Sequence, residues 1–267
     1  MTDLSFVILS YNSQRCIGQC LRHLMEALRT LGLSHDIWIV DNGSSDESLS
    51  IIREHQAANS AVQVIALPTN LGTTVPRNLA LRKCQGEHIV IMDSDAYVSA
   101  ASLEYLLQKS RLRQEVGILV PKLIFPDGRF QLSVDQFPTI TRKIHRFMFL
   151  RSLERNSEQP REETVDYAIS AFWLLPRAVL EKVGLLDENI FYSPEDVDYC
   201  LRVWQAGLQV RYDPAVSIVH DAQEKSRGWK LNRFTWLHLQ GLFYYFCKHR
   251  YAFRLNKLRK RLHIPHS

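Results

Sequence analysis

The first half of this 267-residue sequence predicts an α/β fold, in which helices cover both faces of a doubly wound, Rossmann-like, mostly parallel sheet. Short apolar segments alternate with segments of helical periodicity. The apolar segments contain few polar residues, as expected for strands that are buried on both faces. A composition of 46% apolar and 23% charged residues is that of a globular chain with a sizeable core.

Four strands are predicted in the first half, and each leads into a polar loop. Apolar residues at spacings of three and four predict a helix over Ile17–Leu31, which Gly32 ends. Ser44 and Glu47 have the spacing of a capping box and predict the start of a second helix. A third helix is expected over Thr74–Lys83. The predicted strands are 4–9, 37–40, 62–67 and 89–92.

The second half of the chain is less regular. A helix is predicted over Glu195–Ala206, and the polar stretch Glu154–Glu163 predicts a mobile loop. No internal repeat or interdomain linker interrupts it. The strands predicted in this half are 117–120, 165–175 and 216–219.

Charge is distributed unevenly and divides the chain near residue 224. All 28 Asp and Glu lie within 1–224 beside 22 Lys and Arg, a net charge of −6, whereas 225–267 carries 11 Lys and Arg and no acidic residue. We therefore expect one domain over 1–224, with halves of about 1–98 and 99–224, and a basic extension over 225–267. Such an appendage is typical of a protein that meets an anionic surface, and not of one that binds nucleic acid over a whole face.

Targeting features predict a cytoplasmic protein. No apolar run reaches the roughly 18 to 20 residues that a membrane-spanning helix needs, and Met1-Thr2-Asp3 lacks the regions of a signal peptide. The five cysteines are sparse and odd in number, so a disulfide framework is not expected. Cys16 and Cys20 have helical spacing, but without a second Cys/His pair nearby free thiols are favoured over a metal or redox pair.

Polar clusters follow three predicted strands at their carboxyl ends, at Ser10–Asn12, Asp41–Ser44 and Asp93–Asp95. Open α/β sheets bind ligands beyond this edge. Two carboxylates one residue apart can together hold a hard divalent cation, which would bridge the phosphates of a nucleotide. Asp-x-Asp is also a common loop tripeptide, and its place at this edge is what favours a metal site.

The loop after the first strand discriminates among nucleotide-binding folds. It reads Ser10-Tyr11-Asn12-Ser13 in place of a glycine-rich turn, and no G-x-x-x-x-G-K motif occurs, which argues against a Rossmann dehydrogenase and a P-loop NTPase. Tyr11 could stack on a base, and Asp41 could accept a hydrogen bond from a base imide or a ribose hydroxyl. A surface tyrosine and a helix-capping aspartate are the alternative interpretations.

Several segments, in the same order along positions 4 to about 220, resemble the family 2 glycosyltransferases with the GT-A fold. They are Val7–Asn12, Val40–Asp46, Asn70–Gly72 with Pro76–Asn78, Met92–Asp95, Phe191–Arg202 and Val219-His220. The family contains inverting enzymes that use nucleotide-sugar donors, among them bacterial rhamnosyl- and O-antigen-type transferases. Ala80 stands where many members have glycine, a change expected to affect only local packing. The absence of a Gln-x-x-Arg-Trp motif, which Arg227-Gly228-Trp229 resembles only loosely, counts against a processive synthase.

The resemblance implies a GT-A sheet whose first half binds the nucleotide and whose second half binds the acceptor. Tyr11, Asp41 and Arg77 are then expected to contact the base and ribose of the donor. The implied nucleotide-binding residues are Ser10, Tyr11, Asn12, Asp41, Asn70, Gly72, Arg77, Asn78, Asp93 and Ser94.

The same resemblance implies that Asp93 and Asp95 hold a Mg²⁺ or Mn²⁺ ion with the diphosphate, that Asp196 is the catalytic base, and that Glu195 orients the acceptor or the base. His220 is expected near the metal, with a structural histidine as the alternative. Sugar transfer to a hydroxyl needs one base, and attack from the face opposite the leaving group inverts the anomeric centre. Acidic residues in the first turn of a helix also stabilise its dipole, which is the alternative role for both carboxylates.

The extension allows two interpretations. Its part 234–247 is rich in aromatic residues and 248–261 is strongly basic, a combination found in helices that lie in an anionic membrane interface. A helix that packs on the domain and keeps a solvated basic end is the alternative. Nucleic acid is not an expected partner, because the rest of the chain has the pattern of a catalytic domain.

These features predict a metal-dependent, inverting transferase that moves one sugar from a nucleoside-diphosphate donor to a glycan or lipid-linked acceptor during cell-surface polysaccharide synthesis. The expected location is the cytoplasm, peripheral on the inner face of the plasma membrane. Two alternatives are a catalytically silent relative that binds nucleotide sugar or lipid, and a nucleotidyltransferase. The latter usually has a glycine-rich, basic loop after the first strand, which this sequence lacks.

Overall fold

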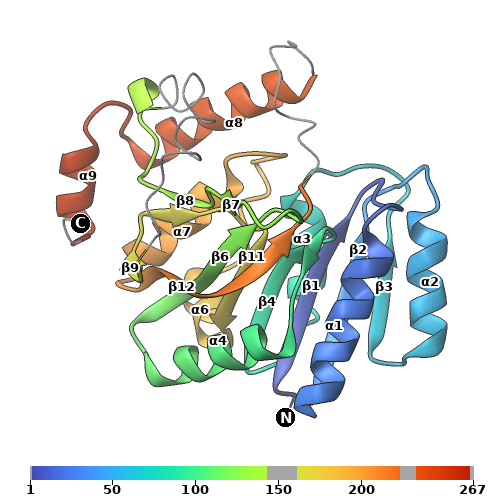
Figure 1. Ribbon diagram of the computed structural model, residues 1–267. Helices are drawn as coiled ribbons and strands as arrows, with labels where there is room; N and C mark the ends of the chain where they lie inside the picture. Colours follow the sequence, from blue (N-terminus) through green and yellow to red (C-terminus); the bar gives the residue numbers. More distant parts are fainter. Residues whose placement is uncertain (1, 143–160, 223–232, 265–267) are drawn as a thin grey trace.

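A ten-stranded sheet lies between two layers of helices in the computed structural model of the chain (Figure 1). The structure describes residues 2–142, 161–222 and 233–264, without the side chains of 233–235. Most of the predicted mobile loop and the tripeptide Arg227-Gly228-Trp229 lie outside these residues.

The first half of the chain has the predicted alternation of strands and helices. Strand β1 lies between β2 and β4 and runs parallel to both, and β3 is parallel to β2. The elements are β1 Leu4–Ser10, α1 Ile17–Leu31, β2 His35–Asp41, α2 Ser48–Ala58, β3 Val62–Ala66, α3 Thr74–Leu81 and β4 His88–Asp93. The predicted capping box is wrong, because α2 begins at Ser48 and the Oγ atom of Ser44 instead accepts a hydrogen bond from the backbone of Asn12.

The second half completes the sheet, whose strand order is β3-β2-β1-β4-β11-β6-β12-β5. Strand β11 is antiparallel to β4 and β6, whereas β12 is parallel to β6. The elements are β5 Ala96–Tyr97, α4 Ala100–Leu112, β6 Val116–Ile124, β7 Phe130–Gln131, β8 Val134–Asp135, β9 Glu163–Thr164, β10 Tyr167–Ala168, β11 Phe172–Pro176, α6 Arg177–Val183, α7 Glu195–Gln205 and β12 Gln209–His220.

Two strand predictions in this half need correction. The strand expected over 165–175 is two strands in different sheets, β10 and β11, because the chain turns at Ser170–Ala171. The last strand, β12, is longer than the expected 216–219 and reaches from Gln209 to His220.

Apolar side chains on the two faces of the sheet form two cores. Phe6 and Ile8 pack with residues of α1 and α4, whereas Val7 between them packs with residues of α3 and α7. This arrangement is the predicted doubly wound sheet, and it leaves the carboxyl ends of β1, β2 and β4 at one open edge.

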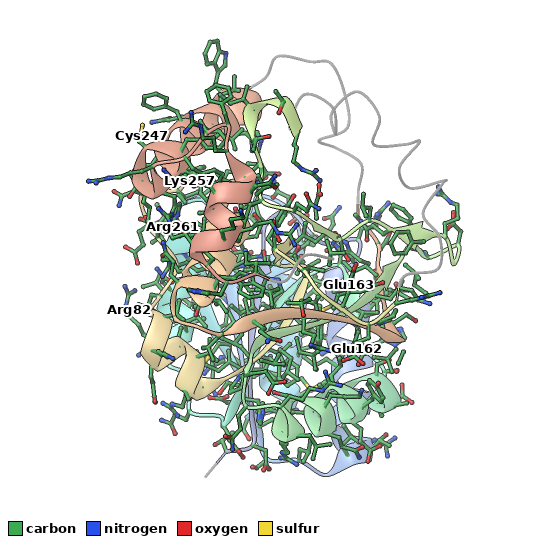
Figure 2. All side chains as sticks on the ribbon, turned by 90° about the vertical axis from the view of Figure 1, so that its left-hand side faces the viewer. Arg82, Glu162, Glu163, Cys247, Lys257 and Arg261 are labelled. Atoms are coloured by element: carbon green, nitrogen blue, oxygen red, sulfur yellow. The ribbon has the colours of Figure 1, made fainter. Side chains whose placement is uncertain are left out.

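The extension folds into two helices, α8 Arg233–His249 and α9 Leu255–Arg261. Tyr245 of α8 and Leu258 of α9 are buried in the core that contains α7, so the extension packs on the domain. Figure 2 shows Cys247 on α8 and Lys257 and Arg261 on α9 along the same side of the molecule. None of the described helices has both the length and the apolar character needed to cross a bilayer.

Candidate active site

Strand pairing gathers three candidate metal ligands at the open edge. Asp93 ends β4, and Asp95 lies two residues further along the chain. His220 ends β12 and pairs with Ala96 of β5, which sets its ring beside Asp95. Its Nε2 atom lies 3.2 Å from Oδ1 of Asp95 and 3.9 Å from Oδ2 of Asp93. The ligand atoms of the three residues lie within 4.8 Å of one another, and no other such trio occurs among the residues described.

The surroundings of His220 fit a metal ligand. Its Nδ1 atom lies 2.9 Å from Oε1 of the buried Gln131 on β7, an arrangement that directs Nε2 toward the two carboxylates. Burial lowers the pKa of His220, but the hydrogen bond to Asp95 and the charges of both aspartates outweigh burial, so the pKa is raised. Two carboxylates suit Mg²⁺ or Mn²⁺, and the imidazole makes the set compatible with a transition metal such as Mn²⁺.

Arg77 joins this cluster to the start of α7. It projects from α3, its side chain is only 3% exposed, and its Nη2 atom lies 2.6 Å from Oδ1 of Asp93. Its Nη1 atom lies 3.0 Å from Oγ of Ser170 and 3.4 Å from Oε1 of Glu195. Burial raises the pKa of Asp93, an effect that the charge of Arg77 opposes. The guanidinium therefore places one buried positive charge between the candidate metal ligands and the predicted catalytic pair.

The two carboxylates that begin α7 have different environments. Glu195 is buried, and burial, together with the charge of Asp196, raises its pKa to about 8 despite the opposing charge of Arg77. Asp196 is half-buried, and its Oδ1 atom accepts a hydrogen bond of 2.7 Å from the backbone amide of Val197. The raised pKa favours the protonated form of Glu195, whereas Asp196 has the more open position.

The carboxyl ends of β1 and β2 supply groups that could meet a nucleotide. Asp41 is buried, and its Oδ2 atom accepts a hydrogen bond from the amide of Ser44. Its Oδ1 atom is buried without a hydrogen-bond partner in the described part of the chain. Buried polar atoms are rarely left unpaired, so this oxygen fits a site that a ligand donor completes. Tyr11 directly follows β1, the strand that pairs with β2, and is 43% exposed.

Several other predicted nucleotide-binding residues hold the loops together. Oγ of Ser10 lies 2.6 Å from Oγ of Ser13, and Oδ1 of Asn12 accepts a hydrogen bond from the amide of Ser45. Asn78 is buried and bonds to the backbone of Leu186 through its amide group. These polar atoms form hydrogen bonds within the protein. Contacts of these residues with a nucleotide stay predictions.

Asn42 organises the loop that follows β3. Its Nδ2 atom donates to the carbonyl of Gly72 and to Oδ1 of Asn70, and its Oδ1 atom accepts from the amide of Leu71. Gly72 has a φ of +83°, and a Cβ there would lie 2.0 Å from the carbonyl oxygen of Phe191. Asn70 and Gly72 thus shape a loop that touches the segment entering α7. Ser94, which stands between Asp93 and Asp95 in the sequence, is buried.

Three residues of the site, Gln131, Ser170 and Asn42, are not among the predicted site residues. Gln131 lies on a two-residue strand and Ser170 in a turn, and neither position carries a local pattern that would mark it. Asn42 stands inside the segment Val40–Asp46, so its place in that motif was an available signal.

Comparison with known proteins identifies the family and the fold of the chain. The family model described as "Glycosyl transferase family 2" matches residues 5–184. The pre-mycofactocin glycosyltransferase of Mycobacterium tuberculosis is 28% identical over 213 residues, which cover 78% of this chain and 41% of the relative. The N-acetylglucosaminyl-diphospho-decaprenol L-rhamnosyltransferase of the same species is 26% identical over 224 residues, or 74% of this chain and 71% of the relative. The chain thus spans about two fifths of the length of the first of these relatives.

A solved structure shows the same fold. The mannosyltransferase PcManGT from Pyrobaculum calidifontis, in complex with GDP-Man and Mn²⁺, superposes with a TM-score of 0.63 at 17% identity, and the match covers 99% of this chain and 72% of that one. The family resemblance predicted from the sequence is confirmed, and so is the predicted sheet. The chain belongs to glycosyl transferase family 2 and has the GT-A fold.

Proposed function

We propose that the protein is a metal-dependent, inverting glycosyltransferase that moves one sugar from a nucleoside-diphosphate donor to an acceptor hydroxyl. The observation that carries the proposal is the link made by Arg77, which contacts Asp93 in the candidate metal cluster and Glu195 beside the predicted base. A donor diphosphate at Asp93 would therefore have its sugar near the start of α7. Family membership supports sugar transfer as the reaction.

Asp93, Asp95 and His220 would hold the metal, and Gln131 would orient the histidine. A divalent cation there would neutralise charge on the departing diphosphate, so the reaction needs no general acid. Arg77 adds a fixed positive charge on the same side, in a buried position where it acts at low dielectric. The Mn²⁺ in the related mannosyltransferase supports this choice of ion.

Asp196 would remove the proton from the acceptor hydroxyl. The neighbouring Glu195, whose pKa is about 8, would stay protonated and donate a hydrogen bond that orients the acceptor or the base. Such a division of roles between adjacent carboxyl groups follows from their different burial. A single base acting opposite the leaving group gives inversion without a covalent intermediate.

Tyr11 and Asp41 would bind the base and ribose. The buried, unpaired Oδ1 atom of Asp41 can accept a hydrogen bond from an imide or hydroxyl, and the exposed ring of Tyr11 can stack. The diphosphate and metal would lie beyond them, toward β4. In this proposal the nucleotide would lie in the half 1–98 and the acceptor in the half 99–224.

A lipid-linked acceptor in the assembly of cell-surface polysaccharide is the acceptor class we propose. The name of the related rhamnosyltransferase describes an acceptor on a polyprenyl diphosphate, and α8 offers a surface suited to a membrane. Trp236, Leu239 and Phe243 are 68%, 50% and 73% exposed. At 100° per residue they share one helix face, separate from the buried Tyr245, and form an apolar stripe.

The exposed basic residues of α9, Lys257, Lys260 and Arg261, would complete this docking surface. The stripe would enter the headgroup region of an anionic bilayer, and Lys and Arg would add roughly 1 kcal/mol each near the surface. The protein would then be peripheral on the inner face of the plasma membrane. The double variant W236A/F243A should float with anionic vesicles less than the wild type, and neutral vesicles serve as the control. Equal flotation of the two proteins would contradict membrane docking by this stripe.

The proposed reaction is tested with the purified full chain. Nucleotide sugars are screened by thermal shift with and without Mn²⁺, since a ligand of the native state raises the melting temperature. The best donor is then used to measure transfer and donor hydrolysis. Binding without either reaction would indicate a silent relative, and formation of a nucleotide–sugar bond from a nucleoside triphosphate would indicate a nucleotidyltransferase. Metal-dependent transfer that inverts the anomeric centre is the result we expect.

A further inference from the structure

The segment Ile190–Pro194, which leads into the predicted catalytic pair, is held from two sides. On the donor side, the amide of Thr73 donates to the carbonyl of Phe191 at 2.7 Å, and the hydroxyl of Thr74 donates to the carbonyl of Ile190 at 2.8 Å. Gly72 approaches the same carbonyl of Phe191 so closely that no side chain fits between them. The start of α7 thus lies against the loop beside the nucleotide site.

On the opposite side, the backbone of α8 packs closely against the same segment. A Cβ atom at Gly241 would lie 2.0 Å from the carbonyl oxygen of Ser193 and 3.2 Å from Cδ of Pro194. Only glycine allows this approach, because real Cβ contacts are not that short. Ser193 and Pro194 immediately precede Glu195 and Asp196, so a shift of about one ångström here would be passed directly to both carboxylates.

Side-chain contacts fix the position of α8 against Asp198 of α7 and against Asp187, which precedes α7. Nζ of Lys248 lies 2.6 Å from Oδ1 of Asp198 and 2.6 Å from Oδ2 of Asp187. Nε2 of His249 lies 2.8 Å from the same oxygen of Asp198, whose side chain is 1% exposed. The hydroxyl of Tyr244 donates to Asp187 at 2.9 Å. A buried charge depends on its partners for stability. If α8 slid along α7, Asp198 would lose its contacts with Lys248 and His249.

We propose that α8 is a positioning element for the catalytic base: Gly241 and Lys248 hold the segment Asp187–Asp198 so that Asp196 meets the acceptor hydroxyl. The inference rests on the proposed role of Asp196. It assigns the extension a function inside the active site, separate from the outward apolar stripe. Neither Gly241 nor Lys248 touches the candidate metal or nucleotide residues, so donor binding should not depend on them.

Two variants of the full chain test the proposal. Gly241→Ala forces the Ser193 carbonyl away, and Lys248→Met removes the charge between Asp187 and Asp198 at similar side-chain size. Each should lower kcat by about 10- to 100-fold, the loss expected for a misplacement of about 1 Å. Affinity for Mn²⁺ with nucleotide should stay within about twofold of wild type. Lys248→Arg, which keeps the charge, should recover part of kcat.

Matched controls separate positioning from general damage. Gly18→Ala places the same methyl group in α1, where the nearest atoms are at an ordinary 3.5 Å, and Lys182→Met removes an exposed lysine of α6. Both should keep the wild-type kcat. Hydrogen–deuterium exchange should rise over Asp187–Asp198 in the two test variants and stay unchanged over His88–Asp95.

The outcomes are distinct. Wild-type kcat in both test variants would overturn the proposal. Loss of donor affinity together with faster exchange throughout the protein would also overturn it, because these two changes together indicate general destabilisation. If the wild type transfers no sugar, the proposed function fails, and exchange alone decides whether α8 holds the segment. Unchanged exchange over Asp187–Asp198 in both variants would then reject the positioning role.

Discussion

Replacing Gln131 by leucine removes the acceptor that the structure gives to Nδ1 of His220. The side chain of His220 is only 9% exposed, so water has little access to replace the lost partner. An unsatisfied buried donor costs about 1–3 kcal/mol, which corresponds to about 5- to 150-fold in affinity. Partners of metal ligands typically contribute about 10- to 100-fold. We therefore expect Gln131→Leu to weaken Mn²⁺ binding by about one to two orders of magnitude.

Calorimetric titration of Mn²⁺ in the presence of the nucleotide measures this effect. Gln131→Glu keeps an acceptor at the same place and should bind Mn²⁺ at least as well as the wild type. Gln136→Leu, the same exchange at a half-buried position nearby, is the matched control and should leave the affinity unchanged. A wild-type affinity in Gln131→Leu, with a wild-type melting temperature, would refute the role of Gln131 in orienting His220 toward the metal.

Three further predictions concern the nucleotide, the metal and the extension. Asp41→Ala should weaken nucleotide binding by about 10- to 150-fold, the value of a hydrogen bond to a charged group, and equal affinity in calorimetry would contradict its role. The raised pKa of His220 means that protons compete with the metal, so Mn²⁺ affinity should fall as pH is lowered through that pKa, and His220→Asn should flatten the profile. Burial would raise the pKa values of Asp187 and Asp198, but partners that include Lys248 outweigh burial, so both pKa values are lowered in the folded protein. The two carboxylates therefore stabilise the fold at pH values above their unfolded pKa near 3.8, and this contribution is lost on acidification. Lys248→Met should therefore unfold at higher pH than the wild type in an acid titration followed by circular dichroism, and coincident curves would argue against these ion pairs.

Much of the first half could be predicted because its signals are local. Apolar runs mark β1, β2 and β4, and polar residues at their ends mark the ligand-binding edge, so the residue pattern alone indicates Asp93 and Asp95 as candidate ligands. His220 could be placed only through the family resemblance. Its position beside Asp95 results from pairing of β12 with β5, a contact between residues more than 100 positions apart that no local pattern encodes.

The parts that could not be predicted depend on such distant contacts. Gln131 and Ser170 gain their roles only when β7 and a turn are brought to His220 and Arg77. The turn at Ser170 also divided a segment whose continuous apolar pattern predicted one strand. The extension fitted both interpretations because its helix has two different faces, one packed through Tyr245 and one exposing Phe243.

In the proposed reaction, one edge of the sheet holds both the metal-bound diphosphate and the catalytic carboxylate. Crystals soaked with Mn²⁺ and the donor found by thermal shift test it through the anomalous signal of manganese. We expect a single peak within coordination distance of Asp93, Asp95 and His220, with the sugar of the donor facing Asp196. A manganese peak away from these three ligands, or a donor sugar on the side of the sheet remote from α7, would contradict it.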